Sequence, residues 1–545
     1  MFYENKLSIK KRIVILFSIL IFLFTYLVYK MVKLQYIEAD KLVSIADSQF
    51  TFEETTSDLN YNLADCNGKN LLNYNEEFYI VIDPYSFAMN NHNTKIDDLY
   101  ALDIILRNYN TKYDLRTINT GTQSQILKWK IDKATYNKIQ SINGVKGYYV
   151  TRKQVVDREN HFYSIENLIS NYNKYSSDGE IIEKNKDSLE GFIHSKTKKN
   201  EPIKKVFKKN TEGTFEDEGY YIPENNKNVR LTIDSEIQKA IKDILNSEKY
   251  NDYKQIGVVM MEADTGKIKA LVQKDDSLPN IILGISTNNG YYPGSIMKAV
   301  IEEAGLESNK ISLNNIYKNK HLFNDHINYD YMNVETAFIA SSNNIFADIG
   351  VEVGINEING LLEEYGMFEK VLNMDLEQSG KYEGDINDVG DTQLASFGQK
   401  HRITMLEALA IPNTIINDGI YVKPYILDAF VDNDNNKIEE YPAESKRVIS
   451  KDTARILKNQ MIQVVTNSLG TGSKAYSEFI DIGGKTGTAT RIDKNNEIYD
   501  GWFAGFYSMG EKKYSMIVFI EDIGDKSGGD TCAPIFKEIC ENIYS

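Results

Sequence analysis

The stretch Tyr291-Tyr-Pro-Gly-Ser-Ile-Met-Lys298 is the most informative part of this sequence. Ser295 and Lys298 are three residues apart, which places both side chains on one face of a helical turn. A serine hydroxyl is a weak nucleophile until a base takes its proton. A lysine becomes such a base when burial or a nearby positive charge lowers its pKa. Pro293-Gly294 predicts a tight turn into a helix start, where backbone N–H groups point at the atom under attack.

The four-residue pattern alone is not specific. Ser-x-x-Lys also occurs at Ser8/Lys11 and at Ser195/Lys198, both in lysine-rich polar stretches that predict a solvated surface. Ser295 differs from these serines in its setting and in two distant motifs that accompany it.

The second motif is Ser341-Ser-Asn343, which follows an expected helix over Val334–Ala340. A single Ser-x-Asn triplet most often caps a helix or forms a turn. The same triplet occurs elsewhere, at Ser141/Asn143, Ser286/Asn288, Ser312/Asn314 and Ser342/Asn344. This motif therefore gains meaning only from its partners.

The third motif is Lys485-Thr-Gly-Thr-Ala489, on the first of three strands expected near the C-terminus. Gly487 inside a strand allows the backbone of a ligand to approach closely. The Lys485 ammonium and the hydroxyls of Thr486 and Thr488 are suited to holding a carboxylate. Taken alone, the stretch also fits a glycine bulge with surface threonines.

In this order the three motifs resemble the active-serine penicillin-recognising enzymes. The second motif begins 46 residues after Ser295, and Lys485 follows another 144 residues later. This long second interval is similar to class B penicillin-binding proteins and longer than expected for class D β-lactamases or related sensor domains. Further stretches that resemble class B proteins are Leu231-Thr-Ile-Asp234, Val258–Glu262, Ser396-Phe-Gly-Gln399, Asn417–Pro424 and Gly501-Trp-Phe-Ala-Gly505.

The resemblance implies an acyl transfer on peptidoglycan stem peptides that end in D-Ala-D-Ala. Ser295 would attack the carbonyl between the two D-alanines, and neutral Lys298 would be the favoured base. Ser341 would relay a proton to the leaving D-alanine, and Asn343 would hold the substrate amide and orient Lys298. β-Lactams would acylate the same serine, and no cofactor is implied.

The resemblance also implies how the substrate is held. Lys485 would set the local potential, and Thr486, Gly487 and Thr488 would form the substrate-binding strand, with the threonines on the terminal carboxylate. The N–H groups of Ser295 and Thr488 would form the oxyanion hole. Two other functions stay open: a β-lactam hydrolase or antibiotic sensor, and a non-catalytic scaffold of the cell-wall machinery.

An apolar run predicts a membrane anchor. Residues Ile13–Tyr29 contain no charge, and Met31-Val32 can extend the span to 13–32. Four basic residues precede it, which predicts a cytoplasmic tail over 1–12 and places the rest of the chain outside. A cleaved signal peptide is the alternative, but no small-x-small cleavage site follows the run.

Composition narrows the remaining choices. A chain of 545 residues predicts two or three domains. A net charge of −16 disfavours nucleic acid as the main partner. Cys532 and Cys540 lie on an expected helix, roughly 12 Å apart at 1.5 Å per residue, too far to form a disulfide. His321 and His326 lack a metal-binding spacing, so we expect no metal and keep a structural zinc as the alternative.

The expected fold class is α+β. Residues 33–227 alternate strands (Phe78–Asp83, Val145–Thr151) with helices (Asp97–Tyr109, Ser164–Tyr172), and the resemblance implies an elongated pedestal domain there. Residues 195–212 hold seven lysines and predict a solvated loop, with contact to an anionic wall polymer as the alternative.

Residues 228–545 form the expected transpeptidase domain. Two strands, 256–262 and 267–272, a mostly helical block over 291–470, three strands (482–491, 502–508, 514–521) and a closing helix predict an antiparallel sheet flanked by helices, with a helical subdomain. An amphipathic helix is expected after Leu231 through Leu245.

The stretch Asn60–Gly68 departs from the class B pattern. Asp65, Asn67 and Gly68 match it, whereas the usual Arg-Gly pair and a second arginine are missing. That departure puts the usual pedestal packing in doubt, and with it the pairing with a membrane glycosyltransferase partner. A bifunctional class A enzyme is disfavoured, because no Glu-Asp-x-x-Phe stretch is present.

Overall fold

The computed structural model describes residues 2–39, 42, 50–118, 125–176, 178–325, 327, 329–493 and 496–544. The chain divides into two compact units. One contains residues 1–59, 75–155 and 202–223, and the other contains 60–74, 156–201 and 224–545. The three motifs all lie in the second unit.

Helix α1 runs from Phe2 to Val32 and continues as a π-helical turn over Lys33–Ile37. The segment Ile9–Ile37 is the one helix of the described residues that is long and apolar enough to cross a membrane. Its side chains are exposed along the whole apolar run, Phe22 by 70%. Because a water-soluble helix of this composition would bury its apolar surface, the exposure fits a lipid-facing segment.

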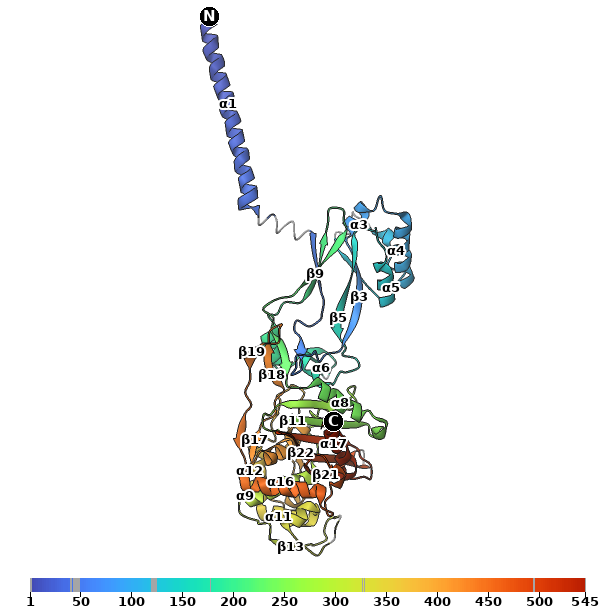
Figure 1. The fold of residues 1–545 in the computed structure, drawn as a ribbon, viewed down its shortest axis with the longest axis vertical. Helices are drawn as coiled ribbons and strands as arrows, with labels where there is room; N and C mark the ends of the chain where they lie inside the picture. The colour runs from blue at the N-terminus through green and yellow to red at the C-terminus, as the bar shows by residue number, and fades with distance from the viewer. Residues whose placement is uncertain are drawn as a thin grey trace. The chain divides into compact units, whose positions relative to one another are not determined.

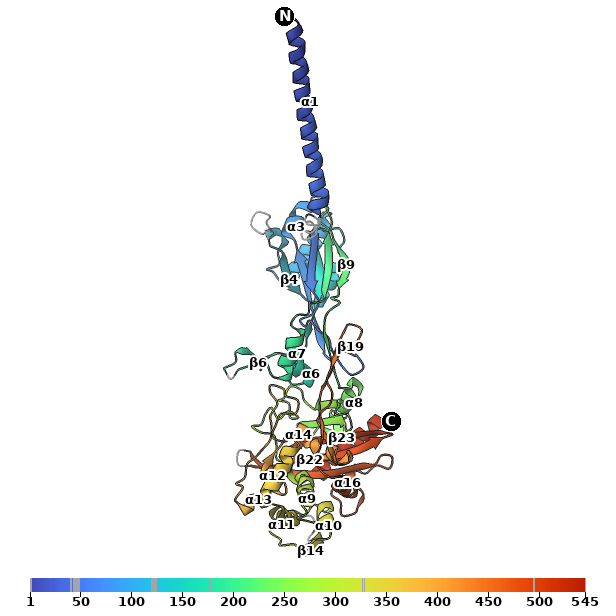
Figure 2. The same ribbon diagram turned by 90° about the vertical axis from the view of Figure 1, so that its left-hand side faces the viewer.

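The first unit holds two three-stranded sheets (Figure 2). One has the order β4-β3-β5 and the other β1-β8-β9. Strand β3 alternates: Phe78, Ile80 and Ile82 join a core with helices α4 and α5, whereas Val81 packs with Tyr149 and Phe207. The bounds are β1 Thr51–Thr55, β3 Tyr74–Ile82, β4 Leu127–Ile131, β5 Tyr148–Val156, β8 Lys204–Lys209, β9 Phe215–Tyr221, α3 Pro84–Asn90, α4 Ile96–Tyr109 and α5 Lys133–Gln140.

The prediction of a solvated loop over 195–212 is wrong. The segment contains the end of helix α7 (Leu189–Thr197) and strand β8, which pairs with β1 and β9. Several of its lysines are already paired with carboxylates: Lys196 with Glu439, Lys204 with Glu53, Lys205 with Asp217 and Lys209 with Asp83. These ion pairs neutralise much of the charge that an anionic polymer would need.

The core of the second unit is a five-stranded antiparallel sheet of order β12-β11-β23-β22-β21. Its strands are β11 Gln255–Glu262, β12 Ile268–Gln273, β21 Ile482–Asp493, β22 Asn496–Met509 and β23 Lys512–Glu521. Helices α8 (Ser235–Leu245) and α17 (Gly528–Tyr544) share one apolar core with it (Figure 1). Central positions are buried on both faces, which explains the continuous apolar runs of β11 and β23.

A helical block lies between β12 and β21, as expected, and its helices α9, α11 and α12 gather together (Figure 2). The main helices are α9 Lys298–Glu307, α10 Val334–Ile339, α11 Asn343–Val353, α12 Ile355–Glu364, α13 Val389–Ala395, α14 Met405–Ala408, α15 Ala410–Ile416 and α16 Lys451–Thr466. Short strands interrupt it, namely β13 Ile316–Lys318, β14 Tyr331–Asn333, β15 Lys381–Tyr382, β16 His401–Arg402, β17 Ile420–Val422, β18 Leu427–Val431, β19 Lys437–Glu440 and β20 Ser445–Arg447.

The divergent stretch Asn60–Gly68 packs within the second unit. Strand β2 (Leu63–Ala64) runs parallel to β10 (Asn228–Leu231) in a sheet of order β19-β18-β10-β2. Asp65 is buried and accepts hydrogen bonds from Ser235 Oγ at 2.7 Å and from two nearby backbone N–H groups. Asp65 thus ties this stretch to the start of α8 without the missing arginines.

The rest of the second unit before β10 is formed by α6 (Ile165–Ser170), the hairpin β6–β7 (Asn173–Tyr175 and Ile181–Glu183) and α7. Helix α6 lies inside the predicted helix Ser164–Tyr172, because the Ser164 side chain caps it by accepting from Asn167 N. All three cysteines are free, and Cys532 and Cys540 are buried in α17.

Candidate active site

The first motif is built on a 3₁₀ turn over Gly294–Met297 that continues into α9 at Lys298. Gly294 has φ +58° and lies against strand β21: a Cβ there would be 2.6 Å from Thr488 O. Gly398 also has no room for a side chain, because a Cβ on it would be 2.1 Å from Gly294 O. Gly294 therefore lets the serine-bearing turn approach the third motif, and Gly398 lets the stretch Ser396–Gln399 approach Gly294, more closely than other residues would allow.

Lys298 is completely buried and joins the first motif to the second. Its Nζ donates to Ser341 O at 2.6 Å and to Asn343 Oδ1 at 2.8 Å, and lies 3.3 Å from Ser341 Oγ. The two N–H groups of a neutral amine match the two carbonyl acceptors, which leaves the nitrogen lone pair able to take a proton.

Ser341 lies between two lysines. Lys485 Nζ donates to Ser341 Oγ at 2.8 Å, and Lys298 Nζ lies 3.3 Å from the same oxygen. Ser341 has φ +58°, in the left-handed region that serine seldom occupies. It precedes α11, whose N-cap is Ser342. The strained backbone places the hydroxyl where both lysines reach it, and such strain gathers at functional sites.

Burial changes the proton affinity of both lysines. Desolvation first, and then the charge of Lys485, hold the pKa of Lys298 well below its usual 10.5, while Asp325 acts in the opposite direction. Burial alone lowers the pKa of Lys485 to about 7. A buried ammonium without a carboxylate partner is costly, so neutral amines are favoured here, as a general base requires.

These groups surround a cleft of about 380 Å³. Its walls include Ser295, Ser341, Asn343, Thr486 and Thr488. Lys298 and Lys485 lie behind this surface, and Gly487 packs against Pro293 O, which a Cβ would approach to 2.6 Å. The structure thus brings together every site residue predicted from the three motifs. Within the described chain the Ser295 hydroxyl makes no hydrogen bond and is free to meet a ligand.

Other residues of the cleft were not predicted. Thr471 shares a 2.6 Å hydrogen bond with Thr486 between their hydroxyls, and Gly528 N donates to Thr488 Oγ1 at 3.0 Å. Phe323 and Phe397 meet edge to face with ring centroids 5.0 Å apart. The other lining residues are Asn324, Asp325, Gln399, Thr490, Ser527 and Gly529. Only the Ser396–Gln399 stretch carried a sequence signal, through the class B resemblance.

Ser195 and Lys198, the competing pair, form no such site. Ser195 lies in α7 and donates its hydroxyl to Phe192 O at 2.7 Å, and Lys198 is exposed at the end of that helix. The bond is an ordinary local contact of a helical serine.

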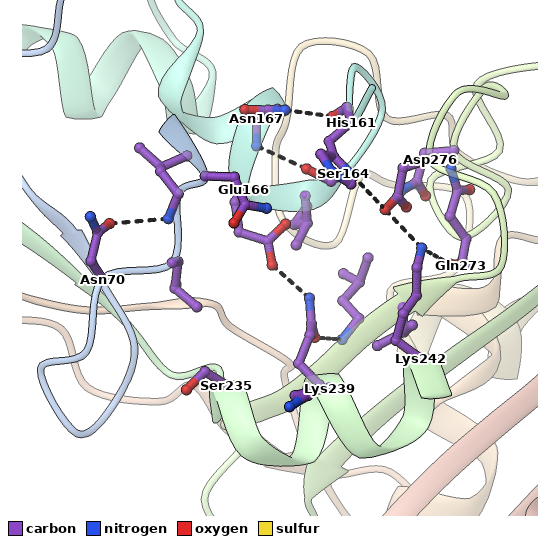
Figure 3. Close-up of a pocket in the computed structure, with 18 residues that line it drawn as sticks. Asn70, His161, Ser164, Glu166, Asn167, Ser235, Lys239, Lys242, Gln273 and Asp276 are labelled. Carbon is purple, nitrogen blue, oxygen red and sulfur yellow. Dashed lines mark hydrogen bonds and ion pairs between the residues drawn. The ribbon is translucent and has the colours of Figure 1, made fainter. Parts of the chain in front are cut away.

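A second cavity, of about 330 Å³, lies between the segments 70–73 and 161–167, helix α8 and strand β12 (Figure 3). Its polar groups bond one another: Gln238 Nε2 donates to Glu166 Oε1 and Lys242 Nζ donates to Asp276 Oδ2, both at 2.7 Å. Since its serines are also engaged in such bonds, it lacks a free nucleophile and is not the candidate active site.

In the described part of the chain, no group of three or more His, Cys, Asp or Glu residues is arranged to hold a metal ion. His321 pairs with Asp330 at 3.7 Å, whereas His326 lies outside the described residues.

Comparison with known proteins decides the family. The profile of the penicillin binding protein transpeptidase domain matches residues 256–541, which include all three motifs. The chain belongs to the penicillin-binding protein transpeptidase family. Together with the curated relatives PbpB and stage V sporulation protein D, this result confirms the class B resemblance and the α+β fold with a transpeptidase domain.

Two curated relatives show how far the similarity extends. Penicillin-binding protein PbpB of Mycolicibacterium smegmatis is 27% identical over 57% of this chain and 53% of its own length. Stage V sporulation protein D of Bacillus subtilis is 25% identical over 59% of this chain and 54% of its own length. The aligned part therefore spans about half the length of these relatives.

Solved structures share the fold over most of the chain. A peptidoglycan synthetase from Bifidobacterium adolescentis matches with a TM-score of 0.62 at 17% identity, covering 91% of this chain and 96% of that one. Penicillin binding protein 3 from Mycobacterium tuberculosis, complexed with aztreonam, matches with a TM-score of 0.58 at 16% identity, covering 90% and 96%. The likeness extends beyond the family domain into the N-terminal part.

Proposed function

We propose that this penicillin-binding protein is a peptidoglycan D,D-transpeptidase that works through a Ser295 acyl-enzyme. One observation carries the proposal: a free serine hydroxyl faces a cleft whose wall joins Lys298, Ser341, Asn343 and Lys485 in one hydrogen-bonded cluster. A nucleophile, a buried base and a second proton carrier are the parts that serine acyl transfer needs.

In the acylation step, Ser295 Oγ attacks the carbonyl carbon between the two terminal D-alanines and its proton moves to Lys298 Nζ. The tetrahedral oxyanion would be met by the N–H groups of Ser295 and Thr488. Each such donor contributes roughly 3–4 kcal/mol in a well-studied hydrolase. The C–N bond then breaks, Ser341 passes a proton to the departing D-alanine amine, and an ester remains on Ser295.

The substrate is positioned by the strand β21. Thr486 and Thr488 line the cleft, and their hydroxyls would bind the terminal carboxylate. Buried Lys485 would supply positive potential when protonated. Asn343 would hold the amide of the stem peptide. These roles follow the cleft geometry and the match of each residue to the family motif.

The ester is resolved when the amine of a second stem peptide attacks it, which forms the cross-link and frees Ser295. A β-lactam imitates the D-Ala-D-Ala end and acylates the same oxygen. The amine released when its ring opens stays tethered to the acyl group, so it hinders the incoming amine and the ester persists. The similar Mycobacterium tuberculosis structure is a complex with aztreonam.

The decisive experiment is covalent labelling with a fluorescent penicillin, followed by mass mapping of the modified peptide. Wild-type protein should be labelled at Ser295, and Ser295→Ala should give no label. Labelling of the variant would refute the nucleophile assignment. A label that is lost within seconds would favour a β-lactam hydrolase, and absence of any label on wild-type protein would favour a scaffold.

The proposal also covers placement in the cell. We infer that residues 1–12 are cytoplasmic, that 13–32 anchor the chain in the membrane, that 33–227 form a pedestal and that 228–545 form the transpeptidase domain outside. A membrane glycosyltransferase that supplies glycan strands is the expected partner. Co-purification from detergent extracts tests that partnership.

A further inference from the structure

Asp325, a carboxylate outside the three motifs, accepts hydrogen bonds from the second motif. Asp325 lies in the loop between β13 and β14. Its Oδ1 accepts from Asn343 N at 2.5 Å, and its Oδ2 accepts from Ser342 Oγ at 2.6 Å and from Asn344 Nδ2 at 3.0 Å. Three consecutive residues directly after Ser341 are therefore bound to a single side chain.

These bonds form at a helix start that needs them. Asn343 is the first residue of the 11-residue helix α11, and its N–H is one of the donors that a helix leaves without an internal partner. A carboxylate at this end also meets the positive pole of the helix. Asp325 thus stabilises the first turn of α11 in both ways.

The residue just before this turn is strained. Ser341 has φ +58°, and a non-glycine residue stays in that strained region only when its surroundings hold it. The contacts to Ser342 and Asn343 supply that hold. They keep Ser341 Oγ within reach of both Lys298 and Lys485.

The same loop also orients the Asn343 amide. Asn343 Nδ2 donates to Asn324 O at 2.9 Å, so the other side of the amide, Oδ1, faces Lys298 Nζ at 2.8 Å. Asn344 is bound as well, because its Oδ1 accepts from the N–H groups of Leu322 and Phe323. The loop and the start of α11 form one hydrogen-bonded unit in which Asp325 is the charged member.

We propose that Asp325 is a positioning residue for the acylation of Ser295, which holds Ser341 and Asn343 in place through its hydrogen bonds to Ser342 Oγ and Asn343 N. The inference rests on the proposed transpeptidase function. The charged groups that act on Lys298 are Lys485, on β21, and Asp325, on the loop. The two act in opposite directions on the Lys298 ammonium, so the charge of Asp325 affects the pH at which Lys298 loses its proton.

The sign of this effect can be tested. Asp325 raises the pKa of Lys298, against the larger lowering effects of burial and Lys485. Removing its charge lowers that pKa further, so Lys298 stays neutral down to a lower pH. The acid limb of the acylation rate, where Lys298 becomes protonated, should therefore move to lower pH even though the loss of positioning makes the maximal rate smaller.

The experiment measures the second-order rate of acylation by a fluorescent penicillin, from pH 5 to 9, on the full chain purified in detergent. We expect Asp325→Asn to acylate about 10- to 100-fold more slowly, as misplacement of reacting groups by about 1 Å does. Its acid limb should lie at lower pH than that of the wild type. Asp325→Glu should restore the wild-type position of the acid limb while its rate stays reduced.

Asp330→Asn is the matched control. Asp330 is in the same loop, its side chain is 82% exposed and its ion-pair partner is His321. This variant should match the wild type in rate and pH profile. The inference is overturned if Asp325→Asn acylates at the wild-type rate, if its acid limb stays in place, or if Asp330→Asn shows the same change. If Asp325→Asn fails to fold, Asp325→Glu decides: a wild-type rate in it would refute the positioning role.

These outcomes differ from a failure of the proposed function. Absence of labelling in the wild type, or labelling of Ser295→Ala, would refute the transpeptidase proposal. A labelled wild type with unchanged Asp325 variants would refute only the role of Asp325.

Discussion

Ser341 is required in two ways that a pair of substitutions can separate. Its hydroxyl contacts Lys485 at 2.8 Å, and its backbone is in the left-handed region. Alanine and glycine both remove the hydroxyl, but only glycine accepts this backbone without strain. The chemistry and the conformation therefore respond differently to the two changes.

We expect Ser341→Ala and Ser341→Gly to slow acylation alike, by about 10²-fold or more, the usual contribution of a proton-transfer group. Ser341→Gly should be more stable than Ser341→Ala by about 1 kcal/mol, because alanine keeps the strain. Penicillin-labelling rates and thermal unfolding check the two expectations. A wild-type rate in either variant would contradict the proton-relay role.

Some residues of the site could be predicted from the sequence and others could not. Ser295, Ser341 and Lys485 carry chemistry in short motifs, so their meeting could be predicted from order and spacing. Asp325 could not, because its role depends on a loop that folds against the start of α11. A lone aspartate in an Asn- and Asp-rich segment has no local pattern that marks such a contact.

At the scale of elements, the turn Gly294–Met297 packs closely against strand β21 because Gly294 has no side chain. We expect Gly294→Ala to destabilise the fold by about 2–4 kcal/mol, because it adds left-handed strain and a contact of 2.6 Å with Thr488 O. Acylation should fall about 10²-fold, since the turn that carries Ser295 must move away from β21. Thermal unfolding and labelling rates provide the measurements.

Gly510 is the matched control for that change. It has nearly the same φ, +61°, but a Cβ on it would meet nothing within 4 Å. Gly510→Ala should cost only about 1 kcal/mol of backbone strain and leave acylation unchanged. Equal effects at the two positions would mean that close approach to β21 does not matter.

Helix α9 carries two buried carboxylates, Glu302 and Glu303, beyond Lys298. Glu303 accepts from the Tyr365 hydroxyl at 2.8 Å, whereas neither oxygen of Glu302 has a well-formed hydrogen bond. Burial raises the pKa of each to about 8. A raised folded-state pKa gives stability that is complete below the unfolded value of 4.5 and is lost as pH rises through about 8.

Glu302→Gln should remove the part of this pH-dependent loss of stability that comes from Glu302, because glutamine does not ionise. The variant should gain stability over the wild type as pH rises from 6 to 9, by of the order of 2–4 kcal/mol at pH 8–9, at about 1.4 kcal/mol per pKa unit. The lowered pKa of Lys485 has the opposite trend, with stability rising above pH 7, but it is common to both proteins. Unfolding curves at several pH values test this, and parallel pH trends would contradict it.

The elements themselves were predictable where burial imposes a pattern. The helix α8 and the strands β11, β12, β21 and β23 were expected close to their observed bounds, whereas β22, expected over 502–508, begins six residues earlier at Asn496. The strand β8 was missed, because lysines dominate it and its exposed face hides the alternation around Phe207, the buried residue. Its pairing with β1, about 150 residues earlier, leaves no trace in the local sequence.

At the scale of the whole molecule, the catalytic cleft depends on folding across long sequence distances. The chain passes repeatedly between its two compact units, and residues 60–74 and 156–201 belong to the same compact unit as residues 224–545. The composition of the sequence changes near residue 228, but it does not indicate where the chain passes from one unit to the other. Asp65 is an example: its hydrogen-bond partner Ser235 lies 170 residues later in the chain, so the contact is visible only in the folded structure.

The orientation of the whole chain in the membrane is the last prediction. Basic residues before the apolar run predict a cytoplasmic N-terminus and an external cleft. In a Cys66→Ser background, the remaining Cys532 and Cys540 are 0% exposed and should not react with maleimides. One new cysteine can then report each side: Ser8→Cys before the span, and Tyr175→Cys after it, where the tyrosine side chain is 63% exposed.

A membrane-impermeant maleimide is applied to bacterial spheroplasts that express each full-length variant. Tyr175→Cys should be labelled in intact spheroplasts, because the substrate of the proposed reaction lies outside the membrane. Ser8→Cys should be labelled only after detergent opens the membrane. The reverse pattern would place the cleft in the cytoplasm, away from peptidoglycan, and would contradict both the anchor's orientation and the proposed function together.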